Sequence, residues 1–539
     1  MKSDIEIAQE IQLKPISEIA ALAGIGEEDI APYGKHIAKL PFGIMDRFRE
    51  RPDGKLVLVT AMSPTAMGEG KTTTTIGLGQ ALRKIGKRSM MAIREPSLGP
   101  CMGLKGGAAG GGYSQVLPME DINLHFTGDF HAITAAHNLL AAVVDNHLHH
   151  RHTPEINPRN VVWKRVMDMN DRSLRSIILG LEDQGRNGVM REDGFVITAA
   201  SEIMAIFCLV NNLRELKERM GNVIVGYDNV RKPIFARDVG VNGAMAALLK
   251  HAINPNLVQS VEGCPVLIHG GPFANIAHGC NTVIATKMAR KLSEYTITEA
   301  GFGADLGAEK FFHIKCRTTG LDPSACVLVV TTRAFNLHGI ANIRKHLDTL
   351  AQFGIPVVVS INSFLTDSPG ELENLRQQCR GLGVDAVITD FRECGGEGGL
   401  ELAEAVVTLC ETPCRLNYLY DLEESLLQKV ENIARKVYGA SGVEVSNEAA
   451  RQIKQIETMG YGNLPVCIAK TQSSLTDNPK IPGFPEDPFT IRVTDARVSA
   501  GAGFVVIYTG SILSMPGLPV NPAALKIDID EHGTISGLF

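Results

Sequence analysis

The chain has 539 residues, of which 44% are hydrophobic and 21% charged, and its formal net charge is −6. This length predicts roughly two to four domains, and the composition is ordinary for a soluble globular enzyme. The slightly acidic balance gives no electrostatic argument for a nucleic-acid partner. No apolar run reaches the ~20 residues of a membrane span, and the first residues are too polar for a secretory signal. We therefore expect a cytoplasmic protein that binds neither nucleic acid nor membrane.

Short β-branched runs alternate with helix-like stretches over most of the chain. This alternation predicts an α/β fold of parallel sheets covered by helices, and residues 1–50 predict helices that precede the first strand. The expected strands lie at residues 55–60, 88–93, 222–226, 265–269, 325–332, 356–361 and 385–389.

The pattern changes after residue 415. Residues 420–437 and 446–459 predict charged amphipathic helices, and residues 489–495 and 503–508 predict short strands. Residues 530–533 predict a turn between two final strands. The tail is therefore expected to be a separate α+β unit.

The most informative segment is residues 65–73, TAMGEGKTT. It follows the expected strand at 55–60 and opens a helix-like stretch at 72–85. Strand, glycine-rich loop, Lys-Thr and helix is the order that a phosphate-binding loop requires. Gly68 and Gly70 let the backbone wrap around an anion with its N–H groups pointing inward.

In such a loop Lys71 reaches the β- and γ-phosphates of a nucleotide, and the Thr72 hydroxyl holds Mg²⁺. The helix N-terminus adds a positive partial charge. Thr65 stands where the usual pattern has its first glycine, so the entry to the loop is non-standard. The structural alternative is a glycine-rich turn between strand and helix with an exposed lysine.

Four further glycine-rich segments lie where apolar runs end, which is where α/β sheets bind ligands. Glycine is conformationally expensive to order, so close approach of the backbone to ligands explains these segments better than a purely structural role. They are residues 103–113, 269–275, 299–307 and 395–399.

Residues 103–113, GLKGGAAGGGY, resemble the first signature of the formate–tetrahydrofolate ligases residue for residue. Residues 329–340 resemble the second signature less closely, because Asn336 replaces a usual Lys and Ile340 a usual Gly. The resemblance extends from residue 3 to residue 539. Further matching runs are residues 94–100, 119–129, 269–281, 298–310 and 461–465.

The resemblance implies a reaction that joins formate to tetrahydrofolate while ATP becomes ADP and phosphate, through a formyl phosphate intermediate. Phosphoryl transfer of this kind needs positive charge and positioning rather than a covalent nucleophile. The resemblance also implies Mg²⁺, a monovalent cation as activator, and a homotetramer.

Several site residues are carried over from the family. Thr65, Gly68, Gly70, Lys71, Thr72 and Thr73 match its ATP-phosphate loop. Arg94 matches the arginine that holds formyl phosphate, since a planar fork of donors suits an acyl phosphate. The alternative for Arg94 is a salt bridge to Glu95. Glu95 and Ser97 are expected to shape the formate site, together with Gly106 and Gly107.

Asp129 matches an acidic site residue that handles a proton or the folate nitrogen. Its structural alternative is the N-cap of the following helix. The catalytic set expected from the resemblance is therefore Lys71, Arg94, Glu95 and Asp129.

Phe302, Phe364 and Leu365 match residues that line the folate and nucleotide clefts, and either Phe is equally compatible with core packing. The family stacks the pterin between a Phe and a Trp. Arg392 stands at the Trp position, so we expect a mixed Phe364–Arg392 sandwich. The alternative is that Phe391 takes the place of the Trp. A segment after Gly339 is also missing relative to the family.

We expect three domains. Residues 1–340 form a nucleotide- and formate-binding domain, residues 341–415 a second α/β domain that contributes to the folate and nucleotide cleft, and residues 416–539 the α+β unit. Two other functions stay open, namely formylation of another acceptor such as dihydrofolate, and an ATP-binding switch without ligase activity.

Overall fold

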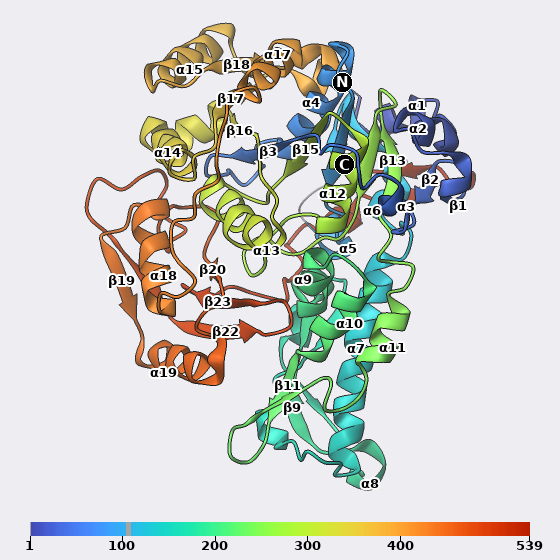
Figure 1. Ribbon diagram of the computed structural model, residues 1–539, viewed down its shortest axis with the longest axis vertical. Coiled ribbons are helices and arrows are strands. Elements are labelled where there is room, and N and C mark those ends of the chain that lie inside the picture. The colour runs from blue at the N-terminus through green and yellow to red at the C-terminus, as the bar shows by residue number, and fades with distance from the viewer. Residues whose placement is uncertain (1, 104–108, 539) are drawn as a thin grey trace.

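The computed structural model describes residues 2–103 and 109–538. Its centre is a 12-stranded sheet whose main path runs β1-β2-β13-β14-β4-β15-β3-β16-β17-β18, with helices packed on both sides (Figure 1). All neighbouring strands from β14 to β18 are parallel. The expected α/β architecture is therefore confirmed. These strands are β14 (Pro265–Ile268), β4 (Ser89–Ile93), β15 (Tyr295–Glu299), β3 (Lys55–Ala61), β16 (Ala325–Val330), β17 (Val357–Asn362) and β18 (Ala386–Thr389).

Strand β3 shows how the sequence builds a sheet buried on both faces. Alternate residues point to opposite faces of a strand. Leu58 packs in the same cluster as Phe311, whereas Val59 packs with Leu78 of α4 (Lys71–Lys84) on the other face. Both faces are covered, so an apolar run without polar alternation is the pattern required there.

Helix α4 packs unusually close to its neighbours because it carries two glycines. A Cβ added at Gly77 would lie 2.1 Å from Phe391, and one at Gly79 would lie 2.0 Å from Met91. Phe391 is fully buried by this approach. The alternative in which Phe391 swings into a ligand site is therefore wrong, because the ring fills the space beneath α4.

The first fifty residues are only partly helical. Helices α1 (Asp4–Glu10), α2 (Ile16–Leu22) and α3 (Ile44–Arg47) are present, but β1 (Ala31–Tyr33) and β2 (Ile37–Lys39) form an antiparallel edge. Strand β2 is buried because it pairs with β13 (Asn256–Ser260). The edge continues through β6 (Ser114–Leu117) and β5 (Gly110–Gly111).

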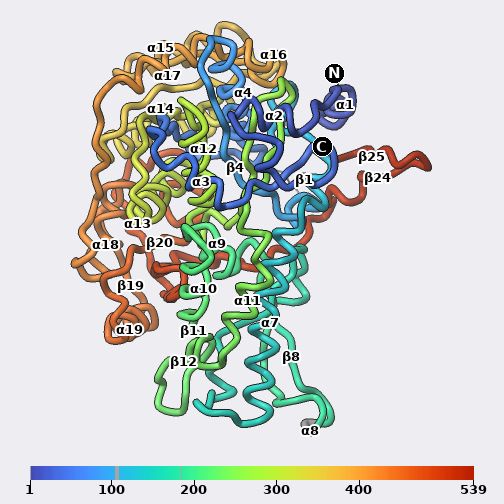
Figure 2. The backbone as a smooth tube through the Cα atoms, turned by 45° about the vertical axis from the view of Figure 1, so that its right-hand side comes forward, coloured from blue at the N-terminus to red at the C-terminus, as the bar shows by residue number. Residues whose placement is uncertain are grey.

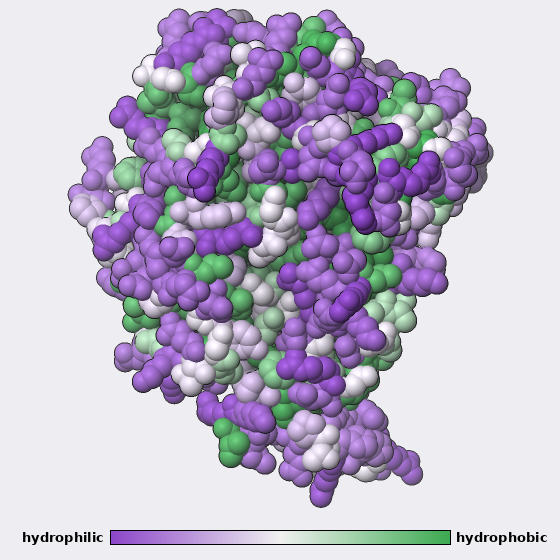
Figure 3. Space-filling model, viewed as in Figure 1, coloured by the Kyte–Doolittle hydropathy of each residue, from purple (hydrophilic) through white to green (hydrophobic). Residues whose placement is uncertain are grey.

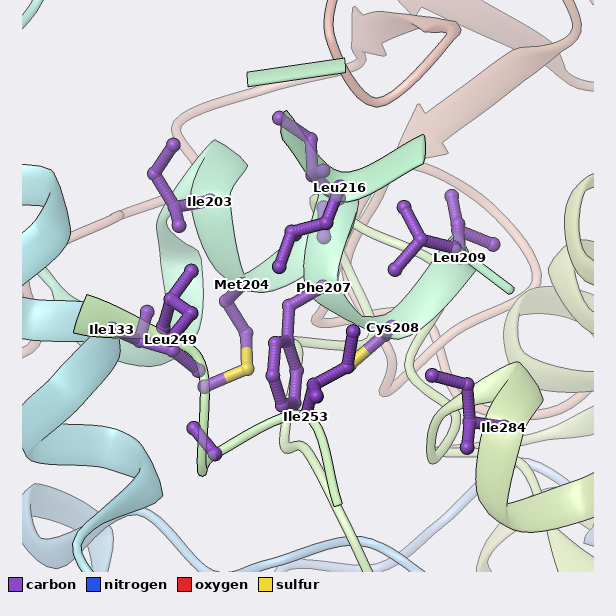
Figure 4. Packing of buried hydrophobic residues seen from close by; sticks show 14 of the residues in the cluster. Ile133, Ile203, Met204, Phe207, Cys208, Leu209, Leu216, Leu249, Ile253 and Ile284 are labelled. Carbon is purple, nitrogen blue, oxygen red and sulfur yellow. The ribbon is translucent and has the colours of Figure 1, made fainter. Parts of the chain in front are cut away.

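A second lobe lies below the sheet, around the long helix α7 (Asp129–His149) (Figure 1). Figure 4 shows its core, where Phe207 lies between Met204 and Cys208. The expected strand at 222–226 is β11 (Ile224–Tyr227), and it pairs antiparallel with β12 (Pro233–Phe235) outside the main sheet. That sheet assignment was wrong because a short turn after β11 lets the chain fold back on itself. The lobe also contains α9 (Glu202–Leu209), α10 (Leu213–Gly221) and α11 (Asn242–Leu248).

The C-terminal residues form small sheets and helices beside both lobes (Figure 1). The expected helices are α18 (Leu426–Ile433) and α19 (Asn447–Ile456), and the expected strands are β21 (Thr490–Val493) and β23 (Phe504–Tyr508). Helix α18 begins later than the pattern indicates because Ser425 and Gln428 form a capping box there. The final hairpin of β24 (Asp528–Ile529) and β25 (Ile535–Ser536) reaches away from the body (Figure 2).

The face drawn in Figure 3 is mostly hydrophilic, with apolar residues in small scattered patches. Among the helices that the structure describes, none combines the length and apolarity needed to cross a bilayer. All eleven cysteines are free, and only Cys394 is exposed and Cys414 partly exposed.

Candidate active site

A cavity of about 810 Å³ opens at the carboxyl edge of the parallel strands. Ligands of open α/β sheets bind at this edge, because the loops that follow several strands converge there. Segments after β3, β4, β14 and β15 provide most of the wall. The lining includes residues 66–73, 94–97, Pro100, Cys101, Gly271, 273–275, Glu299, Gly301 and Phe302. The cavity thus brings together Gly68, Gly70, Lys71, Thr72, Thr73, Arg94, Glu95, Ser97 and Phe302, all of which were predicted from the sequence.

The glycine-rich loop turns sharply into α4. Gly70 has φ 73°, a left-handed conformation that favours glycine, and the helix begins at Lys71. The buried Glu69 closes the entry to the loop, because its Oε1 accepts from the Thr65 N–H at 2.6 Å.

Two neighbouring strands brace this loop. The Thr331 hydroxyl, just after β16, donates to the Glu69 carboxylate. Asn362 at the end of β17 donates from Nδ2 to the Glu69 carbonyl at 3.2 Å. The loop is therefore held in shape before any ligand binds, which lowers the ordering cost of binding.

Glu299 is a site residue that the sequence analysis missed. It ends β15 beside β3, it is buried, and it lines the cavity. The Thr72 hydroxyl donates to its Oε2 at 2.9 Å, while its Oε1 is buried without a partner. The sequence carried one signal for it, because Glu299 is an acidic residue at the end of a strand, and that strand lies beside β3.

Arg94 follows β4 and faces the cavity. Its Nη1 donates to the Pro272 carbonyl at 3.3 Å, and its Nε is buried without a partner. The alternative of an Arg94–Glu95 salt bridge is wrong, since the pair forms no ion pair in the structure. Arg94 therefore keeps donors that a bound anion can accept from.

Glu95 and Asp129 share a buried acidic site behind the cavity wall. Asp129 forms an ion pair with Lys39 at 2.8 Å and accepts from Asn256 Nδ2 at 2.8 Å. Glu95 Oε2 is buried without a partner. Burial, reinforced by the charge of Asp129, raises the pKa of Glu95 well above its ordinary value, and burial likewise raises the pKa of Asp129 against the opposing effect of Lys39.

Asp129 does not line the cavity itself, and it is not an N-cap. Helix α7 begins at Asp129, and its N-cap is Gly128. The side chain points to Lys39 of β2 instead, a strand between β1 and β13 that the sequence analysis did not predict. Lys39 and Asn256 therefore hold the Asp129 carboxylate, and the sequence pattern did not reveal either contact.

Ser97 is anchored by Asp168, another residue that sequence analysis missed. The Ser97 hydroxyl donates to Asp168 Oδ1 at 2.6 Å, and the Leu98 N–H donates to Oδ2 at 2.9 Å. Asp168 thus fixes the turn that carries Arg94 to Ser97. Gly106 and Gly107 lie outside the described residues.

Phe302 occupies a left-handed conformation with φ 64°. A bulky side chain there is strained by the order of 1 kcal/mol, and such strain clusters at ligand sites. Phe302 lines the cavity together with Gly301 and Glu299. Core packing does not account for Phe302, whose side chain is only partly buried.

Phe364, Leu365 and Arg392 lie outside the cavity lining. Arg392 forms an ion pair with Asp4 of α1 at 2.8 Å, and the cation over the Phe364 ring is Arg333 rather than Arg392. The expected Phe364–Arg392 sandwich is therefore not formed, because Asp4 holds the Arg392 side chain. Leu365 is 63% exposed. Gly339, before the missing segment, has φ 72° and breaks α14 (Thr332–Gln352).

A family model described as formate–tetrahydrofolate ligase matches residues 2–539. The chain belongs to the formate–tetrahydrofolate ligase family. It is accordingly a ligase that uses ATP to join formate to tetrahydrofolate with formation of a C–N bond. ATP, formate and tetrahydrofolate are its substrates, and nothing in the family match favours another acceptor or a switch protein.

Proposed function

We propose that the cavity binds ATP and formate, and that formyl phosphate forms in it. A formate oxygen attacks the γ-phosphorus, the bond from that phosphorus to the β,γ-bridging oxygen breaks, and ADP leaves. The anilino nitrogen of tetrahydrofolate then attacks the formyl carbon, the carbon–oxygen bond to phosphate breaks, and the nitrogen loses a proton. The observation that supports this most is the convergence of Lys71, Arg94 and Glu299 on one cavity.

The glycine-rich loop is the proposed phosphate-binding loop, in which Thr65, Gly68, Gly70, Lys71, Thr72 and Thr73 hold the phosphates. Its left-handed Gly70 and the α4 N-terminus support this role. Lys71 neutralises charge on the transferring phosphoryl group, and Arg94 holds the acyl phosphate through a planar fork of donors. Catalysis then comes from positioning and charge rather than from a covalent nucleophile.

Mg²⁺ fits the pair formed by Thr72 and Glu299. The unpartnered Glu299 Oε1 and the Thr72 hydroxyl are oxygen donors of the kind that Mg²⁺ prefers. When bound, Mg²⁺ neutralises phosphate charge and orients the γ-phosphate. Glu299→Gln is expected to raise the Mg²⁺ concentration for half-maximal turnover by about 10- to 100-fold.

Glu95 is the proposed acceptor of the proton released by the folate nitrogen. It lines the cavity, and burial raises its pKa well above the ordinary value, which makes its carboxylate a stronger base. Asp129 tunes Glu95 from behind through its charge. Glu95 and Ser97 are the described residues that shape the proposed formate pocket.

We further propose a cytoplasmic homotetramer in which Phe302, Phe364 and Leu365 contact the substrates' rings, with domain limits at residues 340 and 415. Strands β17 and β18 of the proposed second unit lie in the same sheet as β3, which supports a shared cleft between the first two units.

The experiment is ATP turnover measured with and without formate and tetrahydrofolate in wild type, Lys71→Ala and Arg94→Ala. Two unit charges ~4 Å apart at an effective dielectric of ~20 attract by about 4 kcal/mol. Lys71→Ala should therefore slow turnover at least a hundredfold. Arg94→Ala should lower kcat with little change in the Kd of ATP. Near-normal turnover in a folded Lys71→Ala variant would show that the proposed phosphate loop is wrong.

A further inference from the structure

The C-terminal unit, residues 416–539, reaches the cavity through one short segment. Residues 509–523, which we call the strap, directly follow β23. Among the described residues that line the cavity, Leu513 and Pro516 are the two that the C-terminal unit contributes. The strap therefore supplies a wall of the cavity from a part of the sequence far from the glycine-rich loop.

The strap is tied to the second lobe by its backbone. The Ile197 N–H donates to the Ser514 carbonyl at 2.9 Å, and Arg175 Nε donates to the Met515 carbonyl at 2.9 Å. The Met515 side chain is buried, whereas the Leu513 side chain is 53% exposed. These contacts hold Leu513 at the cavity with much of its apolar surface uncovered. A bound apolar group that covers this surface removes it from water, which favours binding.

The strap lies on the side of the proposed formate pocket. Ile197, which bonds to the strap, is close to α5 (Leu98–Met102), because a Cβ added at Gly99 would lie 2.8 Å from Ile197 Cδ1. Farther along the strap, the Ala523 N–H donates to the Gly103 carbonyl at 2.6 Å, at the end of α5. Helix α5 directly follows the proposed formate residues, so the strap and that pocket are neighbours.

We propose that Leu513, with Pro516 beside it, forms the wall that receives the aryl ring of tetrahydrofolate, the aminobenzoyl group bonded to the nitrogen that is formylated. This proposal rests on the proposed function, which places formyl phosphate beside Arg94. For the transfer step the nitrogen must come within about 3–3.5 Å of the formyl carbon. The aryl ring is bonded directly to that nitrogen, so it must lie next to the formate end of the cavity, where the strap offers apolar surface. Leu513 is thereby a residue that selects the acceptor without contacting the reacting atoms.

The test is the steady-state KM of tetrahydrofolate, ATP and formate in wild type, Leu513→Ala, Leu513→Met and the control Leu525→Ala. Leu525 lies two residues beyond the strap, is 73% exposed and does not line the cavity. Leu513→Ala should raise the KM of tetrahydrofolate by about 3- to 30-fold, because it removes most of the apolar contact. Its kcat and the KM of ATP and of formate should stay within about twofold. Leu513→Met keeps the side-chain volume and should stay close to wild type, as should Leu525→Ala.

Two inhibitors identify the part of the acceptor that the strap contacts. The first, p-aminobenzoylglutamate, carries the aryl ring without the pterin, and its inhibition constant against tetrahydrofolate should rise in Leu513→Ala by about the same factor as the KM. The second, 6-methyltetrahydropterin, carries the pterin without the aryl ring and should inhibit wild type and Leu513→Ala equally. The proposal is refuted if folded Leu513→Ala keeps the KM of tetrahydrofolate, or if the loss appears with ATP or with the pterin inhibitor instead. Lys71→Ala tests the phosphate loop separately, so the two proposals can fail independently.

Discussion

At the residue scale, Phe302 has a backbone conformation that residues with a side chain rarely adopt, and it lies at the cavity. Its φ of 64° disfavours any residue with a Cβ, yet the ring lines the cavity. Phe302→Gly removes both ring and strain, whereas Phe302→Ala removes only the ring. The Gly variant should therefore be more stable than the Ala variant by about 1 kcal/mol. Urea unfolding of the two variants measures this difference, and equal midpoints would mean that the backbone there is not strained.

The buried Glu95 makes stability depend on pH. Its pKa is raised in the folded protein, so the folded state binds its proton more tightly than the unfolded state does. The stabilisation that comes from this tighter proton binding is fully present below the ordinary pKa of 4.5. It is lost as pH rises through the pKa of the folded state. Glu95→Gln should therefore be more stable than wild type at pH 7–8, and the gain should vanish below about pH 4. Denaturant melts across this pH range check the sign. A variant that loses stability at neutral pH would show that the carboxylate is stabilised there.

At the element scale, the closeness of α4 to its neighbours depends on glycine. Gly77→Ala places a methyl 2.1 Å from the Phe391 ring, and this overpacking should cost about 1–3 kcal/mol despite the better helix propensity of alanine. Gly370 of α15 (Pro369–Gly381) has open space around it, so Gly370→Ala is the matched control and should be neutral or slightly stabilising. Thermal unfolding of both variants tests this. Equal Tm shifts would mean that α4 does not need its close approach.

The elements that the sequence predicted well are those with strong local signals. Strand β3 and helix α4 were predicted because an apolar run, glycines and a Lys-Thr pair lie within thirty residues. Strands β1 and β2 were missed because each has only three residues and depends on pairing with β13, far away in the chain. The same limit applies to the site. Arg94 follows strand β4 directly and Lys71 opens the helix after the glycine-rich loop, whereas the contact of Lys39 with Asp129 depends on that distant pairing.

At the scale of the whole molecule, Lys470 joins the C-terminal unit to the turn that follows Phe302. Its ammonium lies 3.2 Å from Asp305 Oδ2, and both side chains are buried. Lys470→Met leaves the Asp305 charge uncompensated and should cost about 3–5 kcal/mol. Adding Asp305→Asn should recover part of that loss, with a coupling of about 1–3 kcal/mol. A double-mutant cycle by denaturant unfolding measures the coupling, and additive losses would mean that the pair does not link the two parts.

The central claim is that formate attacks the γ-phosphate of ATP in the cavity at the carboxyl edge of the sheet. The most direct measurement is the fate of ¹⁸O from doubly labelled formate during turnover with ATP and tetrahydrofolate, followed by mass spectrometry of the released phosphate. Formyl phosphate formation carries one formate oxygen to phosphorus, and attack by the folate nitrogen leaves it there. The account predicts one ¹⁸O in each phosphate released by wild type. Phosphate without ¹⁸O, released at the same rate as 10-formyltetrahydrofolate forms, would contradict it.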